Sequence, residues 1–405
     1  MGPREVPGVL LVGTPATTVH GTCNRSGRAG DGSVLVVETL GPDLYDAIVT
    51  STAVICARGG RTGHMQSLCR SRGIPVLRVA PEDLPDIDGE VTIRIDRHSV
   101  VLGTADTLAT LPEPPAVTPD DLDSVCVVIA GATDIQSTNA ITPRVEQVDT
   151  YFIREEFVCL SAGLSPLDAL RSGEAEAERY GTAIAAELCT MVKELLPGQR
   201  LVMRLLDLRS DDAARITTGV EVADEPNPEL GMHGARWLVE EPFYPHAFRA
   251  LRTHVTERLG QDATLLSFAV PFINDPDEFL RLRRHLALPD DTPLSVFVET
   301  PAAVHHTGEF CAAGASEIFV GTKDLIQFYL AADRGNHLVA SAYQTRHPAV
   351  LAGLRFAVES GLETGTPVHV FALGADLGHY REHLPTGHFM MCTAELQALA
   401  HNSHP

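Results

Sequence analysis

The chain has 405 residues, enough for two domains with separate cores, and a formal net charge of -22 at pH 7. That charge argues against a nucleic-acid partner, because a phosphate backbone requires a basic protein surface. The eight cysteines form no C-x-x-C pair, and the apolar stretch at residues 6–12 is too short for a signal core or a membrane span. We therefore expect a reduced, cytoplasmic protein without a membrane partner.

Residues 1–103 are predicted to form a small β/α domain. Apolar runs at 9–12 and 33–38 are typical of strands, and 90–95 with 99–102 is typical of a hairpin. The segment 21–32 between the first two runs is rich in Gly, Ser and Arg and is predicted to be a loop.

The stretch 58–75 of this domain carries a candidate catalytic residue. A strand at 53–57 is followed by two glycines, by Thr62 as a plausible N-cap, and by His64 in the first turn of a helix that ends at Gly73. Backbone N–H groups at such a helix start favour an anion and disfavour a charged imidazole ring, which keeps the ring nitrogen nucleophilic. This suits a histidine that accepts and passes on a phosphoryl group; the alternative is a capping loop whose histidine is incidental.

Residues 104–122 are predicted to be a linker, since four prolines make the segment semi-stiff and extended. Such a spacer suits a small domain that moves as a body. An ordinary connection packed on the surface is equally compatible with the composition.

Residues 123–405 alternate strand-like and helix-like runs, which is typical of parallel β/α units. The predicted strands are 124–129, 150–153, 200–205, 263–268, 294–298, 317–320 and 368–371, with an eighth at 219–222 or 387–391. The predicted helices are 166–196, 245–259, 276–286, 301–313, 325–332 and 348–360. The alternation predicts a (β/α)8 barrel, with a doubly wound open sheet as the alternative.

Charged residues follow four of these strands, where barrel enzymes place their chemistry. They are Arg154, Arg204, Glu299 and Asp324. Two carboxylates beside two arginines favour a Mg2+ ion with a bound phosphate, although structural salt bridges in the barrel mouth would give the same pattern. Lys323, one of only two lysines in the chain, adjoins Asp324.

Several motifs resemble those of the phosphoenolpyruvate (PEP)-utilising enzymes, which include pyruvate phosphate dikinase, PEP synthase and the PEP–protein phosphotransferase. G-G-R-T-G-H-M is similar to the family's phosphohistidine signature on a swivelling domain. I-R-E-E-F, R-L-L-D, N-P-E-L-G-M-H-G-A-R, V-E-T-P-A-A, F-V-G-T-K-D-L-I-Q-F and L-A-A-D-R-G-N resemble motifs of its PEP-binding barrel. The resemblance covers about residues 9–392.

The resemblance implies roles for individual residues. It gives the catalytic residues as His64, Thr62, Arg204 and Lys323. It gives Glu299 and Asp324 as the Mg2+ ligands. The substrate-binding residues it implies are Arg154, Arg204, Arg334, Lys323, His233 and Arg236, where guanidinium groups clamp oxyanions in a bidentate manner. By the same resemblance we expect a homodimer formed through the barrel.

This chain departs from the family pattern at three positions. Lys323 replaces an asparagine, His233 replaces an arginine, and Phe371 stands where the family has the cysteine acid that protonates the enolate. The nearest candidate acids are His369, expected on the opposite face of its strand, and Asp376.

We expect a phosphotransferase that moves a phosphoryl group between PEP, or a similar enol phosphate, and His64. The sequence shows no Walker-type loop and nothing similar to the family's ATP-grasp domain, so a separate ATP-grasp or phosphocarrier protein is the expected partner. The alternative is a degenerate regulatory or partner subunit that binds PEP or a 2-oxo acid. A Schiff base on Lys323 is a third hypothesis.

Overall fold

A computed structural model describes residues 4–13, 18–60, 63–103, 119–141 and 145–401. They divide into two compact units, and each unit is discontinuous or interrupted in sequence. The small unit comprises Met1–Pro115, Ala332–Tyr343 and Cys392–Pro405, and the large unit comprises Ala116–Ala331 and Gln344–Met391. Residues 104–118, most of the expected linker, lie outside the described part of the chain. The domain boundaries at 103 and 123 therefore stay a prediction.

The small unit contains a closed barrel in the strand order β1-β5-β4-β3-β2-β6-β7. Its elements are β1 (Glu5–Val12), β2 (Thr18–Asn24), β3 (Val34–Val37), α1 (Tyr45–Thr50), β4 (Ala53–Cys56), α2 (His64–Arg72), β5 (Val76–Val79), β6 (Glu90–Arg94), β7 (Ser99–Leu102) and α16 (Thr393–His401). Strands β3, β4 and β5 run parallel, whereas β1 pairs antiparallel with β5 and β7. Buried Val36, Ile55, Leu77 and Ile93 form part of the core.

Two expectations for this unit were wrong. Part of the expected loop at 21–32 is strand β2, and strand β5 was not predicted. Strand β2 has little apolar sequence of its own, and it forms because it pairs antiparallel with β6 and parallel with β3. Pairing with distant strands therefore overrode the local composition.

Helix α2 follows the fully buried strand β4, as expected, and carries Leu68 into the core. It begins at His64, and its N-cap residue is Gly63 with extended backbone (φ -59°, ψ 164°). The expected cap, Thr62, is thus displaced by one position and lies outside the described residues. The helix ends at Gly73, whose φ of 66° is the left-handed conformation that glycine adopts without strain.

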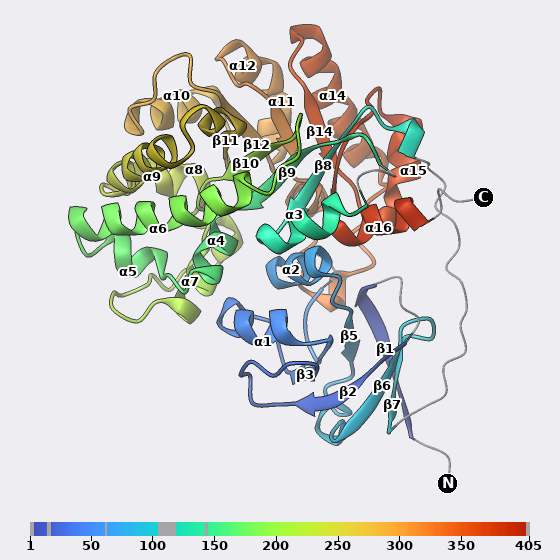
Figure 1. The fold of residues 1–405 in the computed structure, drawn as a ribbon. Coiled ribbons are helices and arrows are strands. Elements are labelled where there is room, and N and C mark those ends of the chain that lie inside the picture. Colours follow the sequence, from blue (N-terminus) through green and yellow to red (C-terminus); the bar gives the residue numbers. More distant parts are fainter. Residues whose placement is uncertain (1–3, 14–17, 61–62, 104–118, 142–144, 402–405) are drawn as a thin grey trace. The chain divides into compact units, whose positions relative to one another are not determined.

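The large unit is a closed barrel of eight strands in the order β10-β11-β12-β13-β14-β15-β8-β9. The strands are β8 (Ser124–Ile129), β9 (Val148–Arg154), β10 (Arg200–Arg204), β11 (Leu266–Val270), β12 (Leu294–Val298), β13 (Ile318–Val320), β14 (Val368–Phe371) and β15 (His388–Cys392). The pairings from β8 through β15 are parallel, and Figure 1 shows helices around the outside of these strands. The expected (β/α)8 barrel is confirmed, and the open sheet is excluded.

The helices of the large unit are α3 (Ala132–Asn139), α4 (Glu155–Ser161), α5 (Pro166–Leu170), α6 (Glu174–Val192), α7 (Ser210–Ile216), α8 (Gly234–Glu240), α9 (Tyr244–Leu259), α10 (Pro276–His285), α11 (Pro301–His305), α12 (Thr307–Ala312), α13 (Thr322–Leu330), α14 (Pro348–Thr364) and α15 (Gly374–His383). Short 3-10 turns are Pro42–Leu44, Leu84–Asp86, Pro119–Asp121, Pro228–Leu230, Gly260–Leu265 and His337–Val339. None of the described helices has the length and apolar character required to cross a membrane.

Several predicted boundaries shift in the large unit. The helix expected at 166–196 is interrupted at Gly173, which has a φ of 107°, and the helix expected at 301–313 divides into α11 and α12. The strand expected at 263–268 begins only at Leu266, after a 3-10 turn. The eighth strand is β15, so the alternative position at 219–222 was wrong.

Candidate functional site

The carboxyl ends of four strands, β9, β10, β12 and β13, bring the expected charged residues to one edge of the large barrel. Arg154 is the last residue of β9, and Arg204 is the last residue of β10, paired with it in register. Glu299 directly follows β12, and Asp324 lies in the first turn of α13, after β13. Because these strands run parallel in one closed barrel, their carboxyl ends lie at the same mouth of the barrel, where barrel enzymes bind ligands.

Arg204 is the centre of this site. Its side chain is 2% exposed, and its guanidinium contacts three carboxylates from three different segments. One terminal nitrogen donates to Glu156 Oε1 at 2.7 Å, and the other lies 3.1 Å from Asp207 Oδ2 and 3.3 Å from Glu299 Oε1. The same oxygen of Glu156 accepts from the Asp207 backbone N–H at 2.9 Å. A planar donor surrounded in this way is held in one orientation.

The site holds more negative charge than Arg204 balances. Burial raises the pKa of the Glu299 carboxyl well above its usual value; Arg204 opposes the shift, and Asp324 and Asp207 add to it. Burial likewise raises the pKa of Glu156, and Arg204 opposes this shift too. Burial by itself would lower the pKa of Arg204, but Glu156, Asp207 and Glu299 together raise it, so the guanidinium stays charged.

These residues fit a divalent cation of the magnesium type. Glu299 follows β12 and Asp324 follows β13, and these two strands are paired neighbours, so both carboxylates lie at the same part of the barrel mouth. Their oxygens are the donors that Mg2+ prefers. Glu156 Oε2 and Arg204 Nε are buried and have no hydrogen-bond partner among the described residues, so the site also has polar atoms for a further ligand.

His233, the N-cap residue of α8, and Arg236, in the first turn of this helix, extend the site. His233 Nδ1 lies 2.6 Å from Asp207 Oδ1, and the centroid of its ring lies 4.1 Å from that of Phe272, with the two rings tilted by 40°. Phe272 follows β11 with an unusual positive φ of 42°, and its backbone N–H donates to Glu299 Oε2 at 3.1 Å. The guanidinium carbon of Arg236 lies over the Phe272 ring, 5.6 Å from its centroid.

Gly234, the first residue of α8, has to be glycine. Its φ is 60°, and a Cβ there would lie 2.4 Å from Phe272 Cβ. The G-M-H-G sequence therefore allows His233 and Phe272 to approach each other closely.

Lys323 reaches toward the end of β14. Its ammonium nitrogen lies 4.5 Å from the ring centroid of Phe371, the residue in the position of the family's cysteine acid. The neighbouring Thr322 hydroxyl donates to the Phe371 carbonyl at 2.9 Å. An aromatic ring beside a cation occupies this strand end, and a phenyl ring cannot donate a proton.

Neither alternative acid takes the place of the cysteine. His369 stacks on Phe319 and lies 3.5 Å from Glu317, at the opposite end of the strands. It shares a face with Phe371, because residues two apart in a strand do so, and the expectation that it lies on the other face was wrong. Asp376 is bound by Thr345 at 2.9 Å and Arg346 at 3.0 Å.

His64 and Arg334 belong to the small unit. His64 is the first residue of α2, after the glycine-rich loop. Arg334 is buried, and its backbone lies so close to this loop that a Cβ on Gly60 would come 1.7 Å from the Arg334 carbonyl oxygen. Arg334 therefore belongs to the same unit as the loop that precedes His64. Arg154 and Arg204 belong to the large unit.

Sequence reasoning gave no role to several polar residues of the site. Glu156, Asp207 and Glu229 were not singled out, although each lies in or beside a quoted motif. Glu229 accepts from Gln327 at 3.1 Å and also pairs with Arg209. The available signal was charge directly after a strand, since burial there requires a partner.

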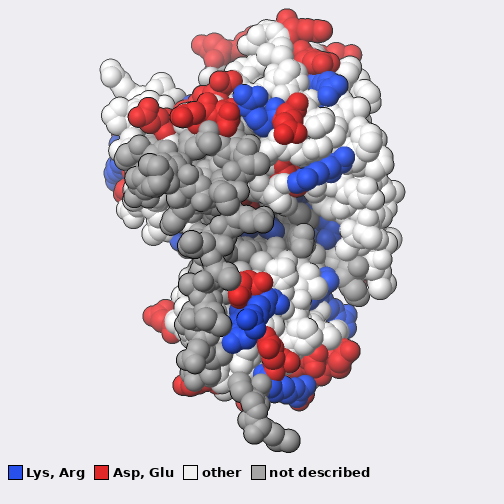
Figure 2. Space-filling model, turned by 90° about the vertical axis from the view of Figure 1, so that its right-hand side faces the viewer, with Lys and Arg blue, Asp and Glu red and all other residues white. Residues whose placement is uncertain are grey.

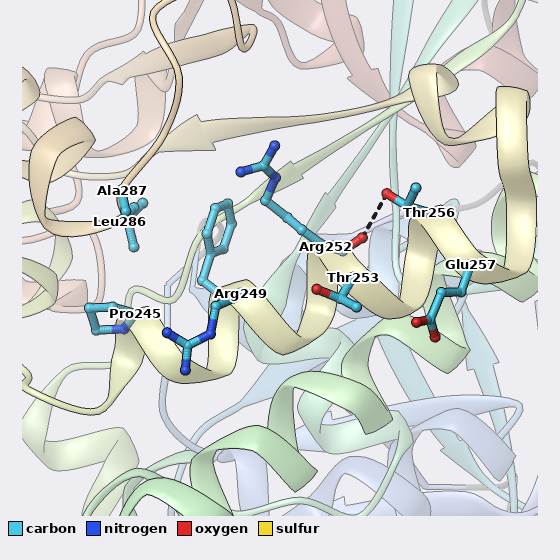
Figure 3. A pocket seen from close by; sticks show the side chains of 9 residues that line it. Pro245, Arg249, Arg252, Thr253, Thr256, Glu257, Leu286 and Ala287 are labelled. Atoms are coloured by element: carbon cyan, nitrogen blue, oxygen red, sulfur yellow. Dashed lines mark hydrogen bonds between the residues drawn. The ribbon is translucent and has the colours of Figure 1, made fainter.

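A separate cavity of about 440 Å³ lies along α9, on the outside of the barrel (Figure 3). Arg249 and Arg252 extend to different sides of the helix in this view. The lining includes Phe248, Arg252 and Leu286 but none of the strand-end residues described above. It is therefore not the candidate site.

Comparison with known families matches residues 152–372 to the PEP-binding domain of PEP-utilising enzymes, and residues 29–99 to the mobile domain of the same enzymes. The chain belongs to the family of PEP-utilising enzymes. The two matched segments fall in the large barrel and in the small unit, which confirms the resemblance drawn from the motifs.

Curated relatives agree with this assignment. A probable PEP synthase of Archaeoglobus fulgidus is 27% identical over 88% of this chain and 47% of its own length. The PEP synthase of Pyrococcus furiosus is 26% identical over 82% of this chain and 42% of its own. A PEP–protein phosphotransferase of Haloferax volcanii is 27% identical over 82% of this chain and 59% of its own. The chain thus spans about half the length of these relatives.

Among solved structures, an aldolase/citrate lyase family protein from Burkholderia cenocepacia matches with a TM-score of 0.36 and 16% identity. The match covers 68% of this chain and 91% of that one. This likeness is too low to carry an argument.

Proposed function

We propose that the protein transfers a phosphoryl group between PEP, or a similar enol phosphate, and His64. The observation that carries the proposal is the buried, charged Arg204 among carboxylates at the strand ends of a PEP-binding domain. The mobile-domain match over residues 29–99 supports His64 as the phosphate carrier.

The substrate is held by charge and by geometry. Arg154 and Arg204, paired at neighbouring strand ends, bind the anionic oxygens of the substrate, and Arg236 and Arg334 are further proposed contacts. Glu299 and Asp324 hold Mg2+, which when bound neutralises the charge that develops on the transferring group.

Transfer then requires His64 to meet the bound phosphorus. The lone pair of its neutral ring nitrogen forms a bond to phosphorus as the phosphorus–oxygen bond of PEP breaks. The electron pair of the broken bond stays on the pyruvate enolate, and the ring gives up its other proton to solvent. Positioning and charge stabilisation supply the catalysis. Thr62 and Lys323 are proposed to assist at the phosphoryl group.

The enolate must still gain a proton at C3. Phe371 cannot supply it, so we propose that solvent or the acceptor reaction completes this step. The phosphohistidine passes to an external partner, with a phosphocarrier or ATP-grasp protein as the proposed class. Cytoplasmic location and a homodimer are parts of the same proposal.

Incubation with Mg2+ and phosphorus-labelled PEP tests the proposal. We expect acid-labile label on the wild-type chain, none on His64→Ala, and at least about tenfold slower labelling on Arg204→Lys, since lysine cannot form the bidentate contact. Arg200→Lys, the matched change at the opposite end of β10, where Arg200 pairs with Glu317, should retain labelling. Equal labelling of wild type and His64→Ala would refute the carrier role.

A second candidate function is binding without transfer, and the contact between Lys323 and the Phe371 ring favours it. In that case the protein acts as a sensor or partner subunit. Calorimetry with PEP and Mg2+ discriminates: heat of binding without any phosphohistidine would establish the second function in place of the first.

A further inference from the structure

Helix α15, on the outside of the large barrel, carries two histidines and a glutamate on one face. They are His379, Glu382 and His383, at helical spacings of three and four residues. One potential ligand atom from each of the three side chains lies within 4.8 Å of those from the other two. The two imidazole rings are 4.1 Å apart between centroids and tilted by 35°.

A hydrogen bond from the ring of His383 to the backbone of His379 leaves the other ring nitrogen of His383 available as a metal ligand. His383 Nδ1 lies 2.8 Å from the His379 carbonyl oxygen, which can only accept, so Nδ1 carries the hydrogen. In the neutral ring, Nε2 of His383 then has a free lone pair. Metal-binding histidines commonly donate their other ring nitrogen to a backbone carbonyl in this way, which fixes the tautomer and the ring orientation.

His379 and Glu382 lack competing partners. The His379 Nε2 atom is buried and has no hydrogen-bond partner among the described residues. Within the same part of the chain, no hydrogen bond or ion pair engages the Glu382 carboxylate.

A second cluster in the large unit shows the contrast. Glu174, Glu178 and His246 also bring three potential ligands together. There, however, Arg249 lies 2.9 Å from His246 Nδ1, 3.4 Å from Glu178 and 3.6 Å from Glu174. A guanidinium already satisfies this cluster, so a cation would have to displace it.

We propose that His379, Glu382 and His383 form a binding site for a divalent transition metal, with Zn2+ as the best fit. Two imidazoles and one carboxylate match the donor set of zinc sites with three protein ligands, which leave one position for water. Imidazole also distinguishes this site from the proposed Mg2+ site, because Mg2+ takes oxygen ligands. The site lies at the C-terminal turn of α15, where the His383 carbonyl also accepts from Arg355 at 2.9 Å. A bound ion would therefore tie down the turn that leads to β15.

Titration of the chelator-treated full chain tests the proposal, with Co2+ as the visible probe and Zn2+ as the competitor. We expect saturable binding whose absorption indicates nitrogen ligands, displacement by Zn2+, and no displacement by Mg2+. Loss of a supporting partner alone costs metal sites about 10- to 100-fold in affinity, so His379→Ala and His383→Ala should each lose at least that much. Glu382→Gln, which preserves shape, should weaken binding less.

His246→Ala, in the cluster already occupied by Arg249, is the matched control and should bind Co2+ as the wild type does. Thermal unfolding of each variant in chelator, followed by circular dichroism, confirms that it is folded. Absence of saturable binding in the wild type, or unchanged binding in the double variant His379→Ala, His383→Ala, would overturn the proposal. So would loss of binding in His246→Ala alone.

Discussion

At the strand ends, the ionisable side chains are buried, and their charge depends on contacts with one another. Arg204, Glu156 and Glu299 are each less than 10% exposed, and each would be unfavourable there without the others. Together they keep a guanidinium charged and oriented in the barrel mouth. The contacts among these residues therefore explain why the charges can be buried.

Glu155, next to this site in sequence, is a different case. Its two carboxylate oxygens accept from the hydroxyls of Tyr180 and Tyr244 at 2.5 and 2.6 Å, and no arginine contacts it among the described residues. Burial raises its pKa from 4.5 to about 7, even though both hydrogen bonds oppose the shift. The folded protein thus binds this proton more tightly than the unfolded chain does.

We predict that Glu155 lowers the stability of the protein as pH rises. Because the pKa of Glu155 is higher in the folded state, its proton stabilises the folded protein. This stabilisation is fully present below pH 4.5, the unfolded-state pKa, and is lost as the pH rises from 4.5 to about 7, the folded-state pKa. The free energy of unfolding of the wild type, relative to Glu155→Gln, should fall by about 3 kcal/mol across this window. Urea unfolding can be followed by the fluorescence of Trp237, the one tryptophan of the chain, whose ring lies 6.4 Å from that of Tyr244.

The control for this prediction is Glu257→Gln, the same chemical change at an exposed position. It should leave the pH profile of the wild type unchanged. A difference between wild type and Glu155→Gln that stays constant from pH 5 to 8 would contradict the prediction.

Helices α6 and α9 show how a single small residue sets the distance between two elements. Gly181 lies inside α6, and a Cβ there would meet the Ala247 backbone oxygen of α9 at 1.9 Å. Backbone atoms cannot move aside as the end of a side chain can. The close packing of these two helices therefore depends on glycine at this position.

We predict opposite effects for two glycine-to-alanine changes in helices. Gly181→Ala should destabilise the large unit by about 1–3 kcal/mol through overpacking, despite the better helix propensity of alanine. Gly308→Ala in α12, where the nearest atom would be 3.9 Å away, should stabilise it by about 0.4–1 kcal/mol. Urea unfolding of both variants measures the difference, and equal shifts for the two would refute the packing argument.

The whole molecule consists of two units, and each unit is assembled from separate stretches of the sequence. Helix α16, at the C-terminal end, packs on α2 in the small unit, and Arg70 of α2 lies 3.8 Å from Glu395 of α16. Leu396 and Leu399 of this helix are buried.

On the face seen in Figure 2, acidic and basic side chains are interspersed among the described residues rather than gathered by sign.

We predict that deletion of residues 393–405 weakens the small unit selectively. Loss of α16 uncovers α2, so amide hydrogen exchange of α2 should accelerate while that of β10 and β12 stays unchanged. Exchange followed by mass spectrometry measures both regions in one experiment. Deletion of residues 402–405 alone is the control; accelerated exchange of β10 with α2 unaffected would contradict the prediction.

Much of this architecture could be predicted from the sequence because it is local. Strands β8, β12 and β14 were predicted to the residue, since continuous apolar runs bounded by turns need no distant partner to be recognised. Arg154, Arg204 and Glu299 were singled out because charge directly after a buried strand is costly unless it has a role.

Only the tertiary structure decided the rest. Strand β2 exists because β6 and β3 pair with it, and the contacts of Glu156 and Glu299 with Arg204 join segments that the chain keeps apart. The approach of two helices at Gly181 and the three-ligand face of α15 likewise depend on geometry in space. The sequence by itself determined the family, the barrel and the strand-end charges, because those are encoded in neighbouring residues. Which charges meet, and which of them lack a partner, was decided by long-range packing.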